Sequence, residues 1–211
     1  MSSAPHPWLE QLIAWATPEA TKDDLLAARK AWFEKMGEVF DDDRQLEMRM
    51  SAFLEHYVCD RVAPHLGATP ARARYLESLA QETPERAAAW RALTETIHGL
   101  FEVRRIKSPE VRLRGLFSGI DFPVTERRQL IGLEVGDVLE CRLVPFGGSL
   151  HFTAAWCFHP HEASKLIRVQ ARTPGLDEAA FTADCAQRAL KAERYRQIAV
   201  EKIYDFSARR F

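Results

Sequence analysis

The sequence lacks the short motifs by which many enzyme families are recognised. Neither of the glycine-rich phosphate loops, GxxxxGKS/T and GxGxxG, occurs in its 211 residues. The nucleophile elbow GxSxG and the zinc motif HExxH are absent as well. These absences lower the expectation of nucleotide binding and of serine or zinc hydrolase chemistry, although they leave other kinds of catalysis open.

Long apolar runs and paired cysteines are also missing. No stretch approaches the roughly 20 apolar residues that a membrane helix needs. The opening MSSAPHPWLEQL has neither the basic start nor the apolar centre of a secretory signal. The cysteines at positions 59, 141, 157 and 185 form no CxxC pair, which argues against a disulfide framework or a zinc ribbon. We therefore expect a cytoplasmic protein with reduced thiols and no membrane contact.

The composition is that of an ordinary globular chain, with 46% hydrophobic and 28% charged residues. The net charge is −1, but residues 1–102 hold 11 Lys and Arg against 17 Asp and Glu, whereas residues 103–211 hold 18 against 13. A basic half suits a nucleic-acid face. It equally suits attraction between the two halves or between two copies, and this interpretation is favoured because acids are interleaved with the basic residues.

Helical spacing and capping signals predict five helices in roughly the first 100 residues. Thr69 and Thr83 each offer an N-cap and are followed by a proline at the first helical position. The helix after Thr83 is expected to reach about Leu100. The three aspartates at 41–43 are expected at a helix start, where carboxylates favour the positive end of the helix dipole.

An alternating pattern replaces the helical spacing near residue 101. Strands are expected in FEVRRI, EVRLRGLF and GIDFPVTE, with inward side chains at Val103, Ile106, Val111 and Leu113. The clearest strand signal, LEVGDVLECRLVPF, should return through a hairpin at Gly147–Gly148 to a partner strand at 149–158. Helices are expected at about 161–171 and 177–203.

Two stretches resemble known sequence patterns. GEVFDDDRQLEMRMSAFLEHYVCDR is similar to a pattern in uncharacterised bacterial proteins, and LEVGDVLECRLVPFGGSLHFTAAWCFHP is similar to a small β module of bacterial proteins, some of which carry zinc-binding SEC-C tails. The Cys-rich SEC-C tail is absent here, so the resemblance implies an architecture and no metal role. The predicted fold class is α+β, with an N-terminal helical bundle in residues 1–101. Residues 102–211 should form a small antiparallel sheet or partial barrel with C-terminal helices.

The segment WCFHPHE places four metal-binding side chain types close together, at Cys157, His159, His161 and Glu162. Zinc needs three or four ligands that converge at about 2.0–2.3 Å. Side chains two apart on a straight strand spread too far, at about 3.3 Å per residue, to close around one ion. A metal site would need a bend at Pro160, so the interpretation as a strand end and a helix start is favoured.

The segment HYVCDR brings His56, Cys59 and Asp60 close together in sequence. A catalytic thiol needs a base, an orienting group and oxyanion donors, and the sequence shows only proximity. Asp60 and Arg61 are therefore interpreted as an ion pair at the end of a helix.

Two further sets of residues are candidates for binding. Basic side chains lie on the two adjacent predicted strands, at Arg104, Arg105, Lys107, Arg112 and Arg114. Small β barrels bind single-stranded nucleic acid through such basic grooves, although exposed arginines also protect a sheet edge. The aromatic tail residues Tyr204, Phe206 and Phe211 suit docking against the protein's own body or against a partner.

The pattern as a whole favours a non-enzymatic regulatory or assembly protein without a cofactor. It is expected to act through contacts with a protein partner or with a second copy as a homodimer. The alternative is an RNA- or single-stranded-DNA-binding protein that uses the basic β module. A metal-dependent enzyme centred on residues 157–162 is the third hypothesis.

Overall fold

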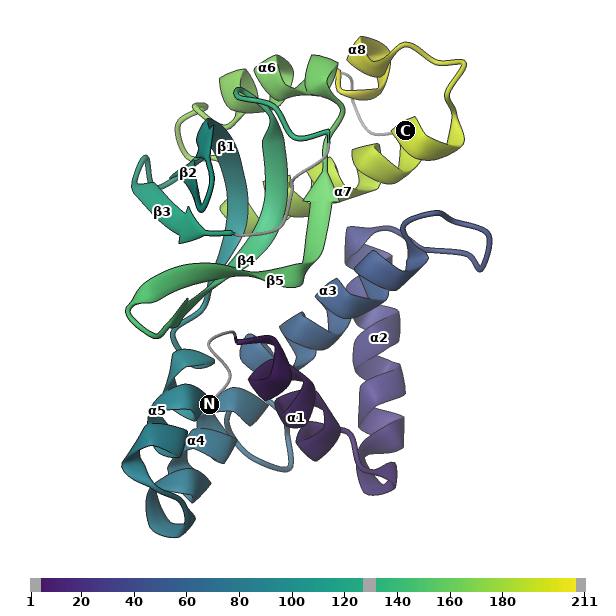
Figure 1. Cartoon of the computed structure of the whole chain (residues 1–211). Coiled ribbons are helices and arrows are strands. Elements are labelled where there is room, and N and C mark those ends of the chain that lie inside the picture. The colour runs from purple at the N-terminus through teal and green to yellow at the C-terminus, as the bar shows by residue number, and fades with distance from the viewer. Residues whose placement is uncertain (1–4, 127–131, 208–211) are drawn as a thin grey trace.

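The structure is a computed structural model, and it describes residues 5–126 and 132–207. Within these residues the chain forms eight α-helices, a short 3-10 helix at Glu19–Thr21 and five strands (Figure 1). The fold class is α+β, as the sequence predicts. None of the helices in this part of the chain combines the length and the apolar character that crossing a membrane requires.

Five helices precede the sheet. They are α1 His6–Ala16, α2 Lys22–Met36, α3 Leu46–Cys59, α4 Pro70–Gln81 and α5 Pro84–Ala92. The predicted cap of α4 is confirmed, because the Thr69 side chain accepts a hydrogen bond from the backbone N–H of Arg72. The expectation that the last of these helices reaches Leu100 is wrong, because α5 ends at Ala92 and a strand begins five residues later.

The aspartates at 41–43 do not begin a helix, since α3 starts at Leu46. The Asp43 carboxylate accepts a hydrogen bond from the backbone N–H of Phe40 and pairs with Arg194, whose Nη2 lies 2.5 Å from Oδ2. The loop before α3 is therefore held by the C-terminal part of the chain instead of by a helix dipole.

The strands form a mixed sheet in which each is hydrogen-bonded to two neighbours, in the ring order β1-β2-β3-β5-β4. They are β1 Ile97–Lys107, β2 Glu110–Gly115, β3 Asp121–Thr125, β4 Val138–Phe146 and β5 Ser149–Phe158. The prediction of a purely antiparallel sheet is wrong in one pairing, because β3 and β5 run parallel over two residue pairs. The hairpin at Gly147–Gly148 is confirmed, and both glycines adopt positive φ angles, 59° and 78°.

The side chains that face into the ring make one apolar cluster. Val103, Val111 and Leu113 are buried there as predicted, together with Leu139 and Leu143 of β4. Ile106 is exposed, although it was expected to point inward. The register shift between Val103 and Arg105 makes Ile106 the partner of the buried Val111, but Ile106 is the last residue but one of β1, and the whole end of that strand from Arg104 to Lys107 is exposed.

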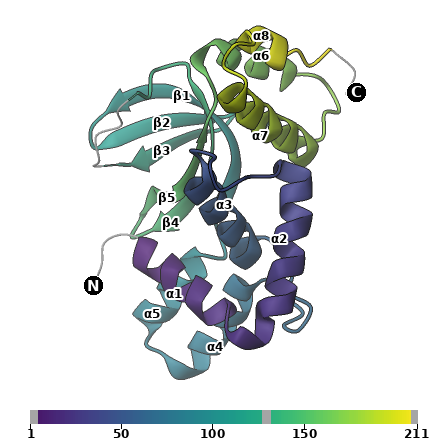
Figure 2. The ribbon, with the colours of Figure 1, turned by 90° about the vertical axis from the view of Figure 1, so that its right-hand side faces the viewer.

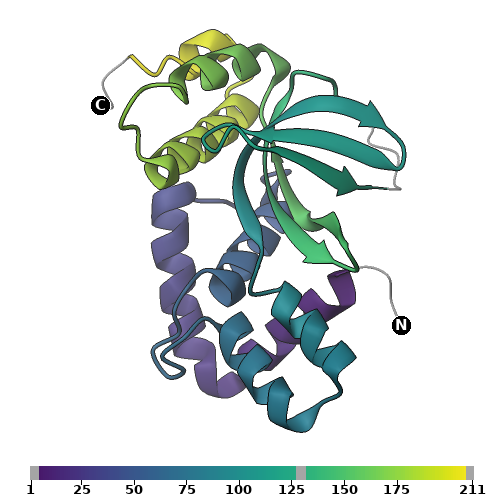
Figure 3. The same ribbon diagram turned by 90° about the vertical axis from the view of Figure 1, so that its left-hand side faces the viewer.

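Three helices follow the sheet, and they are α6 His161–Gln170, α7 Glu178–Arg194 and α8 Val200–Ile203. The helix predicted at 161–171 is confirmed, but the one predicted at 177–203 is broken between α7 and α8. Helix α7 passes beside the sheet and lies against α2, as two views from opposite sides show (Figures 2 and 3). Helix α3 packs on β5, so the outer side of the β4–β5 hairpin is covered by helices.

Candidate functional site

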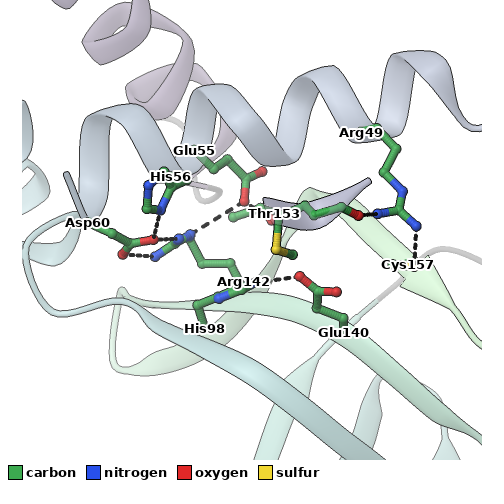
Figure 4. A network of polar contacts seen from close by, with 10 residues as sticks. Arg49, Glu55, His56, Asp60, His98, Glu140, Arg142, Thr153 and Cys157 are labelled. Atoms are coloured by element: carbon green, nitrogen blue, oxygen red, sulfur yellow. Dashed lines mark hydrogen bonds and ion pairs between the residues drawn. The ribbon is translucent and has the colours of Figure 1, made fainter. Parts of the chain in front are cut away.

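A cavity of about 550 Å³ with a mixed charged and apolar lining lies where the helices meet the sheet. Its walls come from α2 and α3 on one side, from β1, β4 and β5 on the other, and from the start of α7. Its charged lining includes Arg49, Glu55 and Asp60 from the α3 side and Glu140 and Arg142 from β4. Figure 4 shows the side chains of α3 pointing toward those of the sheet.

Local sequence spacing explains why these groups meet. Glu140 and Arg142 are two apart on β4, so they share the face that lies opposite to the apolar ring interior. Arg49, His56 and Asp60 follow one another at spacings of seven and four, which keeps them on one side of the helical turn. Because α3 lies over the hairpin, the two polar rows are buried against each other.

Arg142 joins the two rows through a fork of hydrogen bonds. Its Nη1 and Nη2 donate to the two carboxylate oxygens of Asp60 at 2.9 and 2.5 Å, and Nη1 also donates to Thr96 at 2.8 Å. Burial alone would raise the pKa of Asp60, but hydrogen bonds from His56 and Arg142 hold that pKa well below its usual range. Asp60 pairs with Arg142 and not with Arg61, which pairs with Asp24.

Glu55 is buried beside this pair and lines the same cavity. Only 3% of the residue is exposed, and its carboxylate accepts a hydrogen bond of 2.9 Å from the Thr153 hydroxyl. Burial raises the pKa of Glu55 to about 7, although the charge of Arg142, 3.5 Å away, opposes the shift. Glu55 therefore exchanges its proton near neutral pH.

Arg49 is a buried cation that the described residues leave without a carboxylate partner. It is 2% exposed and donates to the carbonyl oxygens of Ala186 at 2.7 Å and Met36 at 3.4 Å. Its Nη2 also lies 3.6 Å from the Cys157 sulfur, and its Nε–H has no partner. Among the carboxylates of residues 5–126 and 132–207, none lies within 4.0 Å of the guanidinium.

Glu140 is the matching anion on the sheet. It is 5% exposed, and its Oε1 lies 3.1 Å from Nε2 of His98, while Oε2 is buried without a partner. Burial would raise the pKa of Glu140, but the hydrogen bond and charge of His98 and the charge of Arg49 lower it. Glu140 is the cross-strand neighbour of Cys157, so Arg49 and Glu140 lie near the same thiol and line the same cavity.

The thiols at this site are unsuited to nucleophilic chemistry. Burial raises the pKa of Cys59 to about 12 and that of Cys157 to about 11. Both are therefore protonated at neutral pH, whereas the thiolate is the reactive form.

The four residues of the hypothetical metal site are separated into different environments. Cys157 contacts Arg49, whereas Nδ1 of the buried His159 lies 3.0 Å from the Tyr204 hydroxyl. His161 lies 2.6 Å from Asp137 at the surface, and Glu162 is exposed on the first turn of α6. The part of the chain that the structure describes contains no group of three or more His, Cys, Asp or Glu side chains that could hold a metal ion.

The five basic residues of the hypothetical nucleic-acid face are exposed on β1 and β2, as the sequence suggests. Acidic neighbours pair with three of them, in the pairs Arg104–Glu102, Arg112–Glu110 and Arg114–Asp121. The nearby rings of Phe117 and Phe122 pack on other aromatic rings, those of Phe181 and Phe101. The structure thus places the basic side chains on two neighbouring strands, whereas the two nearby phenylalanine rings are half-buried against other rings.

The tail residues predicted to bind a partner dock largely against the protein itself. Tyr204 is 0% exposed and cannot serve a partner, because the core of α6, α7 and α8 encloses it. Phe206 packs on Phe181 and under the guanidinium of Arg188. Phe211 lies outside the described residues.

Sequence reasoning missed the residues that make the cavity unusual. Arg49, Glu55, Glu140 and Arg142 are charged residues inside otherwise apolar stretches of a helix and a strand. That departure from amphipathic spacing is the only sequence signal for them, and it does not reveal which partners they meet.

Comparison with protein families, with curated proteins and with solved structures finds no match for this chain. The resemblance to bacterial proteins with a small β module therefore stays a prediction.

Proposed function

We propose that the chain is a non-enzymatic regulatory protein that binds a small polar molecule in the cavity between its helices and its sheet. The observation that carries this proposal is the pair of buried charges, Arg49 and Glu140, that line the cavity and keep unpartnered polar atoms. An unsatisfied buried polar group costs about 1–3 kcal/mol. A ligand with charged groups of opposite sign beside these two side chains would offset part of this cost.

The size and the position of the cavity support the same proposal. Its volume of about 550 Å³ lies within the roughly 300–1,000 Å³ of small-molecule sites. Because its walls come from both the helical half and the sheet, a bound molecule would link the two parts and restrain them together. We expect a protein partner, or a second copy of the chain, to respond to that restraint.

A stability screen of the purified protein against a library of small metabolites tests the proposal. A ligand at a concentration of 100 Kd should stabilise the protein by about 2.7 kcal/mol. The variant Ala52→Leu, which enlarges a side chain of the cavity wall, should lose the response, whereas Ala88→Leu on the exposed surface of α5 should keep it. A library without any stabilising compound would refute ligand binding, and turnover of a bound compound would refute the non-enzymatic role.

A second candidate function is binding of single-stranded nucleic acid, which the exposed basic side chains on β1 and β2 favour. Arg105 and Lys107 form no ion pair with the described residues, so they are the members of this set most available to phosphate. Affinity for an oligonucleotide should then fall steeply with salt. The double variant Arg105→Ala/Lys107→Ala should weaken binding and reduce the salt dependence, and an unchanged affinity would exclude this face.

A further inference from the structure

We infer that the molecule bound in the cavity is a small zwitterion with an apolar side chain, of the kind represented by a free aliphatic amino acid. This inference rests on the proposed function and names the class of ligand. Its two charged ends are assigned to two buried charged residues of the lining, with the carboxylate at Arg49 and the ammonium at Glu140.

Three other charged residues of the lining, Arg142, Arg61 and Glu55, form ion pairs within the protein. Arg142 is held by both carboxylate oxygens of Asp60, and Arg61 is held in the same way by Asp24. Arg49, by contrast, meets only neutral acceptors, which are two carbonyl oxygens and a thiol. An arginine binds a carboxylate through strong charge-assisted hydrogen bonds, and Arg49 lines the cavity without such a partner among the described residues.

Glu140 offers the complementary acceptor. One of its oxygens meets His98, and the other, Oε2, has no partner. A primary ammonium group carries three donors and no acceptor, so it suits a carboxylate with a spare oxygen. Glu140 stands opposite Cys157 on the neighbouring strand, and Cys157 contacts Arg49. The two charges therefore lie close enough for the ends of one small molecule.

Opposite charges on the two sides of the cavity select against ligands with a single charge. A simple anion at Arg49 would be repelled by Glu140, and a simple cation at Glu140 would be repelled by Arg49. A zwitterion places an anionic group beside Arg49 and a cationic group beside Glu140, and it adds no net charge to a buried site.

The apolar part of the cavity wall determines which side chain the ligand carries. Helix α2 contributes Ala28, Trp32 and Met36 to the lining, and all three are largely buried. An apolar side chain of medium size would contact this wall and displace water from it. Leucine and methionine should therefore bind more tightly than glycine or serine.

Calorimetry with a matched set of probes tests the inference on the intact protein. The set contains the twenty standard amino acids together with leucinamide, which lacks the carboxylate, and 4-methylpentanoic acid, which lacks the amine. Leucine or another apolar amino acid should bind. Each truncated analogue should bind roughly ten- to hundredfold more weakly, because it forfeits one charge-assisted hydrogen bond.

Two conservative variants assign the ends of the ligand. Glu140→Gln should weaken leucine binding roughly ten- to hundredfold and leave 4-methylpentanoic acid bound as well as before or better. Arg49→Lys should weaken both compounds. The controls Glu82→Gln and Arg74→Lys change a part-buried ion pair outside the cavity and should leave affinity unchanged. If Arg49→Lys fails to fold, the two analogues and Glu140→Gln still decide the assignment.

The outcomes separate this inference from the proposed function. Equal affinity for leucine and for either analogue would overturn the zwitterion and keep the cavity as a ligand site. The same holds if none of the twenty amino acids binds while another class of metabolite does. If no compound of any charge class binds, the inference and the proposed function both fail.

Discussion

Glu55 makes the stability of this protein depend on pH in a direction opposite to that of most carboxylates. The pKa of a solvent-exposed glutamate is 4.5, and burial raises that of Glu55 to about 7 in the folded protein. The folded state therefore holds this proton more tightly than the unfolded state. Its contribution to stability is fully present below about pH 4.5 and is lost as the pH rises through about 7. A difference of about 2.5 pKa units corresponds to about 3 kcal/mol.

The substitution Glu55→Gln isolates this effect. Glutamine keeps the shape of the side chain and an oxygen for the Thr153 hydroxyl, but it carries no charge at any pH. We expect the variant to be more stable than the natural protein by less than about 1 kcal/mol at pH 5 and by up to about 3 kcal/mol at pH 9. The attraction of Arg142 is already included in this figure, because it contributes to the pKa of Glu55.

The measurement is urea unfolding at pH 5, 6, 7, 8 and 9, followed by the fluorescence of the five tryptophans. The difference between the two proteins is the informative quantity, because His159 titrates in the opposite sense. Burial lowers the pKa of His159 to about 4, so its contribution is lost as the pH falls from about 6.5 toward 4. In the natural protein alone, the pH dependence of stability due to Glu55 and that due to His159 would partly cancel.

The control Glu82→Gln should behave in the opposite way. Burial would raise the pKa of Glu82, but hydrogen bonds from Trp90, Arg86 and Arg74 lower it. Its substitution should therefore destabilise the protein, and more so above pH 5 than below. A difference between Glu55→Gln and the natural protein that stays constant from pH 5 to 9 would refute the reasoning. So would a variant that is less stable at pH 9, because the ion pair with Arg142 would then outweigh burial.

Three further predictions follow from the same contacts. Arg142→Met should destabilise the protein by about 3 kcal/mol in urea unfolding, because it leaves the Asp60 carboxylate with only its contact to His56. A change below about 0.5 kcal/mol would show that solvent replaces the guanidinium. Tyr204→Phe should cost about 1 kcal/mol by the same assay, since it removes the hydroxyl that meets His159, and no loss would contradict that hydrogen bond. Buried thiols such as that of Cys157 should react with Ellman reagent only when the protein is unfolded, and rapid labelling of Cys157 in the native protein would contradict its burial.

Helix starts and turns could be predicted from the sequence where a few neighbouring residues determine them. The Thr69 cap and the Gly147–Gly148 turn depend on one or two residues whose conformational preferences act within a few positions of the chain. The sequence does not predict the break between α7 and α8, because contacts between distant residues cause it. Arg188 donates to the carbonyl oxygens of Ile203 and Asp205, and the side chain of Ile203 packs into the core with Tyr204. No glycine or proline marks the break in the sequence.

The candidate site could not be predicted because its partners are distant along the chain. Glu55 and Thr153 are 98 residues apart, and Asp60 and Arg142 are 82 residues apart. From the sequence, Arg142 is an ordinary charge on the outer face of a strand, where solvent would be expected. Only the docking of α3 on the hairpin makes that face an interior one.

The buried charges of this protein fall into two groups with different physical explanations. Arg142 pairs with Asp60 through two hydrogen bonds and with Glu55 at 3.5 Å, so the ion pairs between α3 and β4 account for its burial, although its Nε makes no hydrogen bond. Arg49 and Glu140 keep polar atoms without partners, and apolar side chains of similar volume are often neutral or stabilising in place of buried ionic groups. Stability alone would therefore give little reason to keep these two residues beside a cavity, whereas recognition of a molecule with two opposite charges requires both of them.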